Sequence, residues 1–114
     1  MPATLRPGAT FSGPVVYVGD GDGLCVDVGR RQSPADAVEV RLADFYAPEL
    51  SEPGGPDAMR ALERITKGRR VVCVAGRRTY DRVAAVCRIG GRSLGDLMRR
   101  EGVREGGRGF RPGG

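Results

Sequence analysis

The sequence predicts an α+β domain in which five short strands and two helices follow one another in the order β-β-β-α-β-β-α. Short runs rich in β-branched residues recur along the chain, and Gly and Pro separate them. Two other stretches repeat apolar residues at the three- and four-residue spacing of a helix. A chain of 114 residues holds one such domain with a single modest core.

The first two strands are predicted to form a hairpin. Residues 11–18 and 24–28 have the β-branched content of strands, and the glycine-rich segment 19–23 between them reads as a tight turn. This turn carries Asp20 and Asp22. The hairpin therefore brings two carboxylates close together.

A third strand is predicted over residues 37–45, where polar and apolar side chains alternate. Val38, Val40 and Leu42 share one face, which places Arg41 on the opposite face. Pro48 ends this strand and opens a loop rich in proline and glycine.

The rest of the domain continues with a helix, two strands and a second helix. The predicted segments are a helix around residues 58–65 that stops at Gly68, strands 71–75 and 83–89, and a helix that begins at a capping-box-like Ser93 and ends at Gly102. We expect residues 1–10 to be a flexible leader, residues 11–103 to be the folded domain, and the Arg/Gly-rich residues 104–114 to be a disordered tail.

The composition excludes several classes of protein. There is no histidine, which rules out serine–histidine hydrolases and histidine-ligated zinc. Catalysis would have to rest on carboxylates, arginines and tyrosines, with a hard cation such as Ca²⁺ or Mg²⁺.

No apolar run approaches the ~18 residues of a membrane span. The start of the chain lacks the apolar segment of a secretory signal, so we expect a cytoplasmic protein with no membrane partner.

The three cysteines lie in apolar runs and show no C-x-x-C spacing. The favoured interpretation is that Cys25, Cys73 and Cys87 are buried free thiols in a reducing compartment. A cross-strand bridge between Cys73 and Cys87 is the alternative, and the sequence does not decide between them.

The net charge of +5 conceals a strong asymmetry. Residues 1–59 carry four arginines against nine acids, a net −5, whereas residues 60–100 carry twelve basic residues against three acids, a net +9. An acidic half beside a basic half suits a site that holds a cation and binds a polyanion, and solvated faces are the alternative.

Five residues have side chains suited to phosphodiester chemistry. The carboxylates of Asp20 and Asp22 can offer oxygens to a hard cation, although an Asp-Gly pair is also common in hairpin turns. Glu49 can accept a proton from an attacking water, or it is a solvated loop acid. Arg41 and Arg82 can meet phosphate oxygens through two donors each, or they are ordinary surface residues.

Four motifs, taken in their order along the chain, resemble those of the staphylococcal nuclease family over roughly residues 11–103. Residues 19–23 are similar to the family's D-G-D-T segment, with Gly23 in place of the threonine, and residues 41–49 to its R-L-x-x-x-D-[AT]-P-E segment. Residues 80–82 resemble its Y-G-R, and residues 94–103 its helix L-x-x-x-L-[VM]-R-x-G-[LV]. The resemblance implies a closed five-stranded OB-fold barrel with helices, here without the last helix of the longer relatives.

The resemblance also implies roles for particular residues. It places Arg41, Glu49 and Arg82 at catalytic positions, Asp22 and the backbone carbonyl of Ala47 at a Ca²⁺ site, and Tyr80 at a phosphate. Tyr46 stands where the family carries a metal-binding aspartate, and a phenol with a pKa near 10 is a poor calcium ligand. We expect Asp20 and Asp44 to be weaker candidates for the same cation, with Asp44 a partial compensation for Tyr46.

The leading hypothesis is therefore a monomeric thermonuclease-like endonuclease that hydrolyses DNA or RNA with a divalent cation and that Tyr46 weakens. The alternative is an inactive OB-fold module that binds single-stranded DNA or RNA through its basic half. Only three Tyr and three Phe are present, which weakens the alternative because stacking requires rings.

Overall fold

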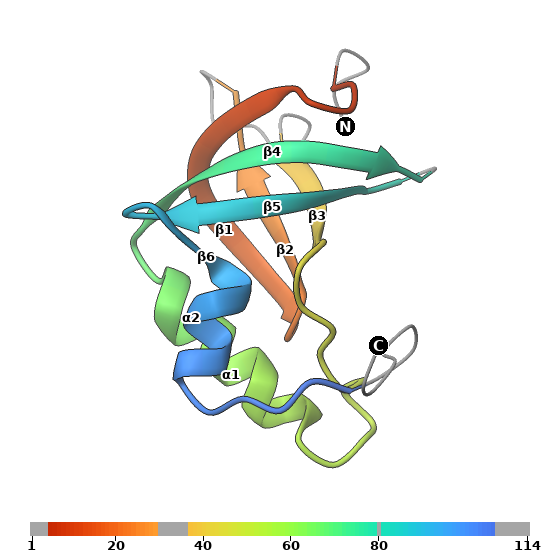
Figure 1. The fold of residues 1–114 in the computed structure, drawn as a ribbon, viewed down its shortest axis with the longest axis vertical. Coiled ribbons are helices and arrows are strands. Elements are labelled where there is room, and N and C mark those ends of the chain that lie inside the picture. Colours follow the sequence, from red (N-terminus) through yellow and green to blue (C-terminus); the bar gives the residue numbers. More distant parts are fainter. Residues whose placement is uncertain (1–4, 30–36, 80, 107–114) are drawn as a thin grey trace.

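The computed structural model describes residues 5–29, 37–79 and 81–106. Their elements, in chain order, are β1 Thr10–Asp20, β2 Gly23–Asp27, β3 Ala37–Leu42, α1 Gly55–Thr66, β4 Arg70–Arg78, β5 Val83–Ile89, β6 Arg92–Ser93 and α2 Leu94–Arg100. Figure 1 shows the curved sheet, with both helices packed together on one side of it. The predicted order is confirmed, with β6 as a short addition.

Strands β1 to β5 close into a barrel. The sheet runs in the order β3-β2-β1-β4-β5, and a parallel pairing of β3 with β5 joins its two ends. All other neighbouring strands pair antiparallel, so the barrel is mixed. The expected α+β barrel of the OB-fold type is therefore confirmed, and its closure removes the open edges that strands of a flat sheet would expose.

Several strand boundaries differ from the prediction, and β4 continues to Arg78 instead of ending at residue 75. β1 extends to Asp20, so the hairpin turn shrinks to residues 21–22. β3 ends at Leu42 instead of continuing to residue 45. After Ala43 donates its N–H to the Ala85 carbonyl, the chain turns, and the ring of Phe45 becomes fully buried. The alternation predicted over residues 37–45 therefore stops at Leu42.

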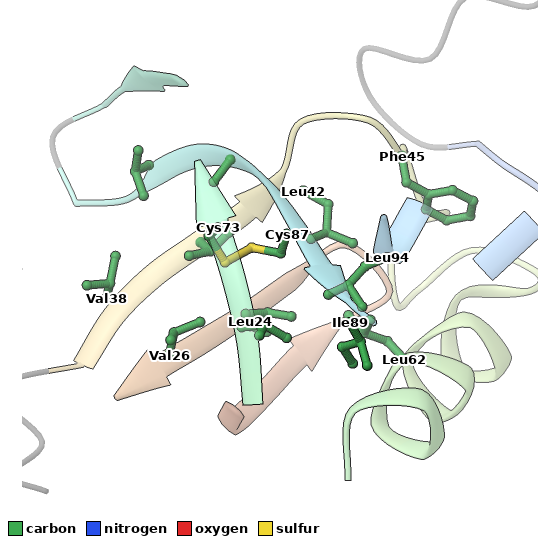
Figure 2. Close-up of a cluster of buried hydrophobic side chains, with 14 of the residues drawn as sticks. Leu24, Val26, Val38, Leu42, Phe45, Leu62, Cys73, Cys87, Ile89 and Leu94 are labelled. Atoms are coloured by element: carbon green, nitrogen blue, oxygen red, sulfur yellow. A yellow bond between two sulfur atoms is a disulfide. The ribbon is translucent and has the colours of Figure 1, made fainter. Parts of the chain in front are cut away.

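The barrel interior and the helices share one apolar core. Figure 2 shows Leu24 and Leu42 from the strands close to Leu62 of α1 and Leu94 of α2. These four side chains are at most 1% exposed. α2 begins at Ser93 as expected, because the Ser93 hydroxyl accepts the Asp96 N–H. In the described part of the chain, neither helix has the length and apolar character that a bilayer crossing requires.

Cys73 and Cys87 form a disulfide between β4 and β5, where they lie directly opposite each other. The favoured expectation of free thiols is therefore wrong for this pair, since the ladder register brings two inward-facing residues together. Cys25 is free and partly buried. Disulfides are rare in reducing compartments, so the cysteines no longer support a cytoplasmic location.

Both ends of the described chain contact the barrel. Leu5 is buried in the core, and the Gly8 N–H donates to the Ala75 carbonyl on β4. At the other end the Gly106 N–H donates to the Tyr46 carbonyl. Ordered contacts therefore occur before residue 11 and after residue 103, and the remaining parts of the expected leader and tail lie outside the described residues.

Candidate functional site

The barrel topology brings three distant segments to one place. Gly23 of β2 lies opposite Arg41 in the antiparallel ladder, and Arg41 lies opposite Ala84 of β5 in the parallel ladder. The turn between β1 and β2, the end of β3 and the start of β5 therefore meet at one end of the barrel. The candidate residues gather there although the first and the last, Asp20 and Arg82, are 62 positions apart in the sequence.

A pocket of about 300 Å³ lies at this meeting point. It is lined by Asp20, Asp22, Arg41, Ala47, Pro48, Glu49 and Arg82. All three expected catalytic residues and both expected metal-site residues are therefore brought together. The lining holds three carboxylates and two guanidinium groups, which makes the pocket strongly polar.

Asp22 is the most constrained of these residues. Its Oδ2 accepts the Ala47 N–H at 3.0 Å, and its backbone N–H donates to Asp20 Oδ1 at 3.2 Å. Burial raises the pKa of Asp22 to about 6, with the Ala47 N–H and the Arg41 charge acting in the opposite direction and Asp20 adding to the rise. The site thus holds a carboxylate whose negative charge is incompletely compensated.

Gly21 is what allows Asp22 to reach this position. A Cβ at residue 21 would come within 2.6 Å of the Cβ atoms of Ala47 and Ala58, so no larger residue fits without movement. The turn therefore packs directly against the loop after β3 and against α1. The sequence reasoning missed this role, because a glycine between two aspartates is equally expected in a simple turn.

Arg41 makes two contacts that orient its guanidinium. Its Nη1 donates to the Leu42 carbonyl at 3.3 Å, and its Cζ lies 4.3 Å from the centre of the Tyr46 ring. Tyr46 is not among the residues that line the pocket. The guanidinium of Arg41 therefore stacks on the ring of Tyr46 in a cation–π contact.

Glu49 is exposed, and its backbone is held in a tight turn. The Glu49 N–H donates to Glu52 Oε1 at 2.7 Å, and the Glu52 N–H donates back to the Glu49 carbonyl. A Cβ on Gly55 would overlap that carbonyl, so the start of α1 abuts the turn. The Glu49 carboxylate has no hydrogen bond or ion pair with any other described residue, which leaves it available to water or a ligand.

Two further candidates lie elsewhere. The Asp44 side chain packs against Gly95 at the start of α2 and does not line the pocket. Its Oδ1 is buried without a hydrogen-bond partner in the described part of the chain. Asp44 is therefore not placed to compensate for Tyr46. Tyr80, expected at a phosphate, lies outside the described residues.

The donor set limits what kind of cation fits. Within residues 5–29, 37–79 and 81–106, no group of three carboxylate or thiol side chains is close enough to hold a metal. The Asp20–Asp22 pair provides two carboxylates, and the raised pKa of Asp22 marks a charge that a cation would neutralise. These residues fit a hydrated divalent cation on one or two carboxylates better than Ca²⁺ enclosed by six to eight protein oxygens.

The chain matches no protein-family model, and no curated protein matches it significantly. The residues that line the pocket are therefore the features of this protein that point to a function.

Proposed function

We propose that this protein is a thermonuclease-like phosphodiesterase that cleaves DNA or RNA with the help of a divalent cation. One observation carries the proposal. A single pocket is lined by Arg41, Arg82, Glu49 and the Asp20–Asp22 pair, which come from four separate parts of the chain. The proposal also agrees with the motif resemblance, which named the same residues independently of the fold.

Each group has a distinct task in this proposal. Arg41 and Arg82 bind the non-bridging oxygens of the phosphate and neutralise the charge that develops on them. Glu49 orients the attacking water and accepts its proton, since its carboxylate is exposed to the pocket and not engaged by another described residue. Pro48 and the turn at Glu52 hold Glu49 at the edge of the pocket.

Asp22 and Asp20 would hold the cation, with the backbone carbonyl of Ala47 as a further oxygen. When bound, the cation supplies charge neutralisation at the phosphate and lowers the pKa of a water molecule. Because the protein offers few oxygens, waters or the substrate must complete the coordination. We expect Ca²⁺ and Mg²⁺ to be the ions to compare.

Cleavage of single-stranded DNA by the purified protein tests the proposal. Each reaction contains Ca²⁺, Mg²⁺ or a chelator, and Glu49→Ala serves as the catalytic variant. Asp57→Ala is the matched control, because it removes an exposed carboxylate that neither lines the pocket nor contacts Glu49. Metal-dependent cleavage that is lost in Glu49→Ala and kept in Asp57→Ala supports the proposal. Equal cleavage by all three proteins contradicts it.

The cation–π contact favours a second candidate function. Tyr46 offers its ring to Arg41 and contributes no carboxylate, and Asp44 lies away from the pocket. A barrel with this arrangement can bind the phosphate of a single strand through Arg41 and Arg82 without cleaving it. Binding without cleavage in the same assay, with a steep salt dependence, identifies this second function.

Tyr46→Asp separates the two functions most directly. The substitution adds a carboxylate at the position next to Ala47 and removes the ring that orients Arg41. We expect metal-dependent cleavage to rise by about tenfold or more, because one preorganised charge in such a site is commonly worth ~10²–10³ in rate and part of this gain is lost with the Arg41 contact. Tyr46→Asn is the control, because asparagine is similar in size to aspartate but uncharged. It is expected to give no gain in cleavage.

A further inference from the structure

The aromatic ring of Tyr17 on β1 is exposed to solvent. A register shift between Val15 and Tyr17 interrupts the β1–β2 ladder, and such a bulge turns two successive side chains outward. Val16 and Tyr17 are 55% and 64% exposed. Tyr17 is therefore a large exposed ring on the outer face of the barrel, and no ring or cation of the described residues stacks on it.

A second pocket joins Tyr17 to the candidate site. This hollow of about 300 Å³ is lined by Tyr17, Cys25 and Glu39, which lie side by side on three neighbouring strands, and also by Asp20 and Arg82. Asp20 and Arg82 line the candidate catalytic pocket as well. The two pockets are therefore contiguous, with Tyr17 at the far end.

A third pocket begins at Tyr17 and continues away from the site. It is the groove of about 610 Å³ between β1 and α1, whose lining includes Val15–Val18, Arg60, Arg64 and Lys67. Arg60 and Arg64 are paired with Asp57 and Glu101 in exposed ion pairs, which contribute little energy and exchange readily for other anions. The groove therefore offers three cations against the single acid Glu63.

We propose that these three pockets form one track for a single-stranded nucleic acid, in which a base next to the bound phosphate stacks on Tyr17 and the following phosphates lie along Lys67, Arg60 and Arg64. The inference rests on the proposed phosphate site and adds a binding site for the flanking nucleotides. An exposed ring between an arginine-lined pocket and a cationic groove fits the alternation of base and phosphate in a single strand. A duplex does not fit, because its bases are already stacked inside the helix.

Equilibrium binding of a fluorescent single strand of about twelve nucleotides, within the site size of one OB-type barrel, tests the track. Chelator is present, so that no cleavage occurs. Tyr17→Ala is expected to weaken binding about 5- to 150-fold, the range expected for the loss of stacking with one base, and Tyr17→Phe to bind within about twofold of the parent. Val72→Ala is the control, since Val72 is 52% exposed on β4 and lines none of the three pockets. An oligonucleotide without bases should make the parent and Tyr17→Ala equal.

The cationic end is tested by the salt dependence of the same binding. Lys67→Ala is expected to reduce the slope of log K against log salt by about 0.7, the contribution of one phosphate contact on a single strand. Arg100→Ala is the matched control, because it removes one exposed charge outside the three pockets and should leave the slope unchanged. Protection of Cys25 is a separate measurement. Bound oligonucleotide should slow the chemical modification of this free thiol, which lies in the pocket with Tyr17 and Glu39.

The outcomes separate this inference from the proposed function when cleavage of a small chromogenic phosphodiester, too short to reach Tyr17, is measured in parallel. Tyr17-dependent binding without cleavage of either substrate supports the track and contradicts the nuclease. Cleavage of both substrates with unchanged binding and KM in Tyr17→Ala supports the nuclease and overturns the track. Duplex binding as tight as single-strand binding, or an unchanged affinity in Tyr17→Ala, also overturns the track.

Discussion

The barrel interior and the charged end of the barrel are built on opposite principles. The interior is lined by side chains such as Leu24, Leu42 and Leu62 that are at most 1% exposed. The buried Thr66 hydroxyl on α1 is satisfied, because it donates to the Leu62 carbonyl at 2.8 Å. At the charged end, burial instead holds the Asp22 carboxylate away from water and raises its pKa.

The two regions contribute to the stability of the fold with opposite sign. Apolar burial contributes favourably to folding, whereas a partly buried carboxylate beside a second carboxylate opposes it. No ion pair between described residues joins the three carboxylates to the two arginines of the pocket. A phosphate with a bound cation carries both charges. The phosphate would pair with the arginines of the pocket and the cation with its carboxylates.

The largest effect is expected from breaking the interior. Leu24→Ala removes a side chain that is 1% exposed and should lower the free energy of unfolding by about 2–5 kcal/mol. Urea denaturation followed by circular dichroism measures the change. Val72→Ala on the outer surface of β4 is expected to stay within about 0.5 kcal/mol. Comparable losses in both variants would contradict the assignment of the core.

Breaking the charged end should affect activity and leave stability nearly unchanged. Arg41→Ala and Arg82→Ala are each expected to reduce cleavage about 10²–10³-fold, equivalent to roughly 3–4 kcal/mol of transition-state stabilisation. Their free energies of unfolding should change by less than about 1 kcal/mol, because both side chains are only partly buried. Arg100→Ala, with full activity, is the comparison; a similar loss there would mean that only overall charge matters.

The disulfide between β4 and β5 offers a covalent way to weaken the barrel wall. Its cysteines are 14 positions apart, and closing a loop of about this size stabilises a fold by roughly 3 kcal/mol. The double variant Cys73→Ala/Cys87→Ala should therefore unfold more readily by about this amount. Cys25→Ala serves as the control, and mass spectrometry before and after reduction establishes the bond. If reduction leaves the parent's stability unchanged, the bond does not form in solution.

A smaller effect of opposite sign is expected at Asp22. The pKa of its carboxyl is raised from 3.8 to about 6, so the folded protein holds the proton more tightly than the unfolded chain does. The free energy of unfolding of the parent therefore falls as the pH rises through this interval. Asp22→Asn, which can still accept the Ala47 N–H, should be more stable at pH 7 in chelator, because it removes the buried charge. The expected gain is only roughly 1 kcal/mol, since the side chain is partly solvated.

The stability gain of Asp22→Asn is expected to depend on pH. It should vanish below about pH 3, where the carboxyl is protonated in both the folded and the unfolded state. Asp57→Asn, in an exposed pair with Arg60, is the control and should show no such gain. A constant difference between Asp22→Asn and the parent across the whole pH range would attribute the effect to packing.

Much of the fold was predictable because it is encoded locally. Alternation along residues 37–42, the i, i+3, i+4 spacing in α1 and the Ser93 cap each involve neighbours in the sequence, and each appears in the structure. The end of β3 was predicted too late because the burial of Phe45, a tertiary contact, decides where the strand leaves the ladder. Cys73 and Cys87 were misassigned for a similar reason, since only the β4–β5 register places them opposite each other.

The sequence by itself determined the order of strands and helices and the presence of two aspartates, a glutamate and two arginines at short, recognisable spacings. Only the tertiary structure decided that these groups share one pocket, because the parallel pairing of β3 with β5 joins residues about forty positions apart in a register that no local pattern specifies. It also decided that Tyr46 faces Arg41 while Asp44 turns toward α2. Side-chain types are local properties, whereas their distances depend on how the barrel closes.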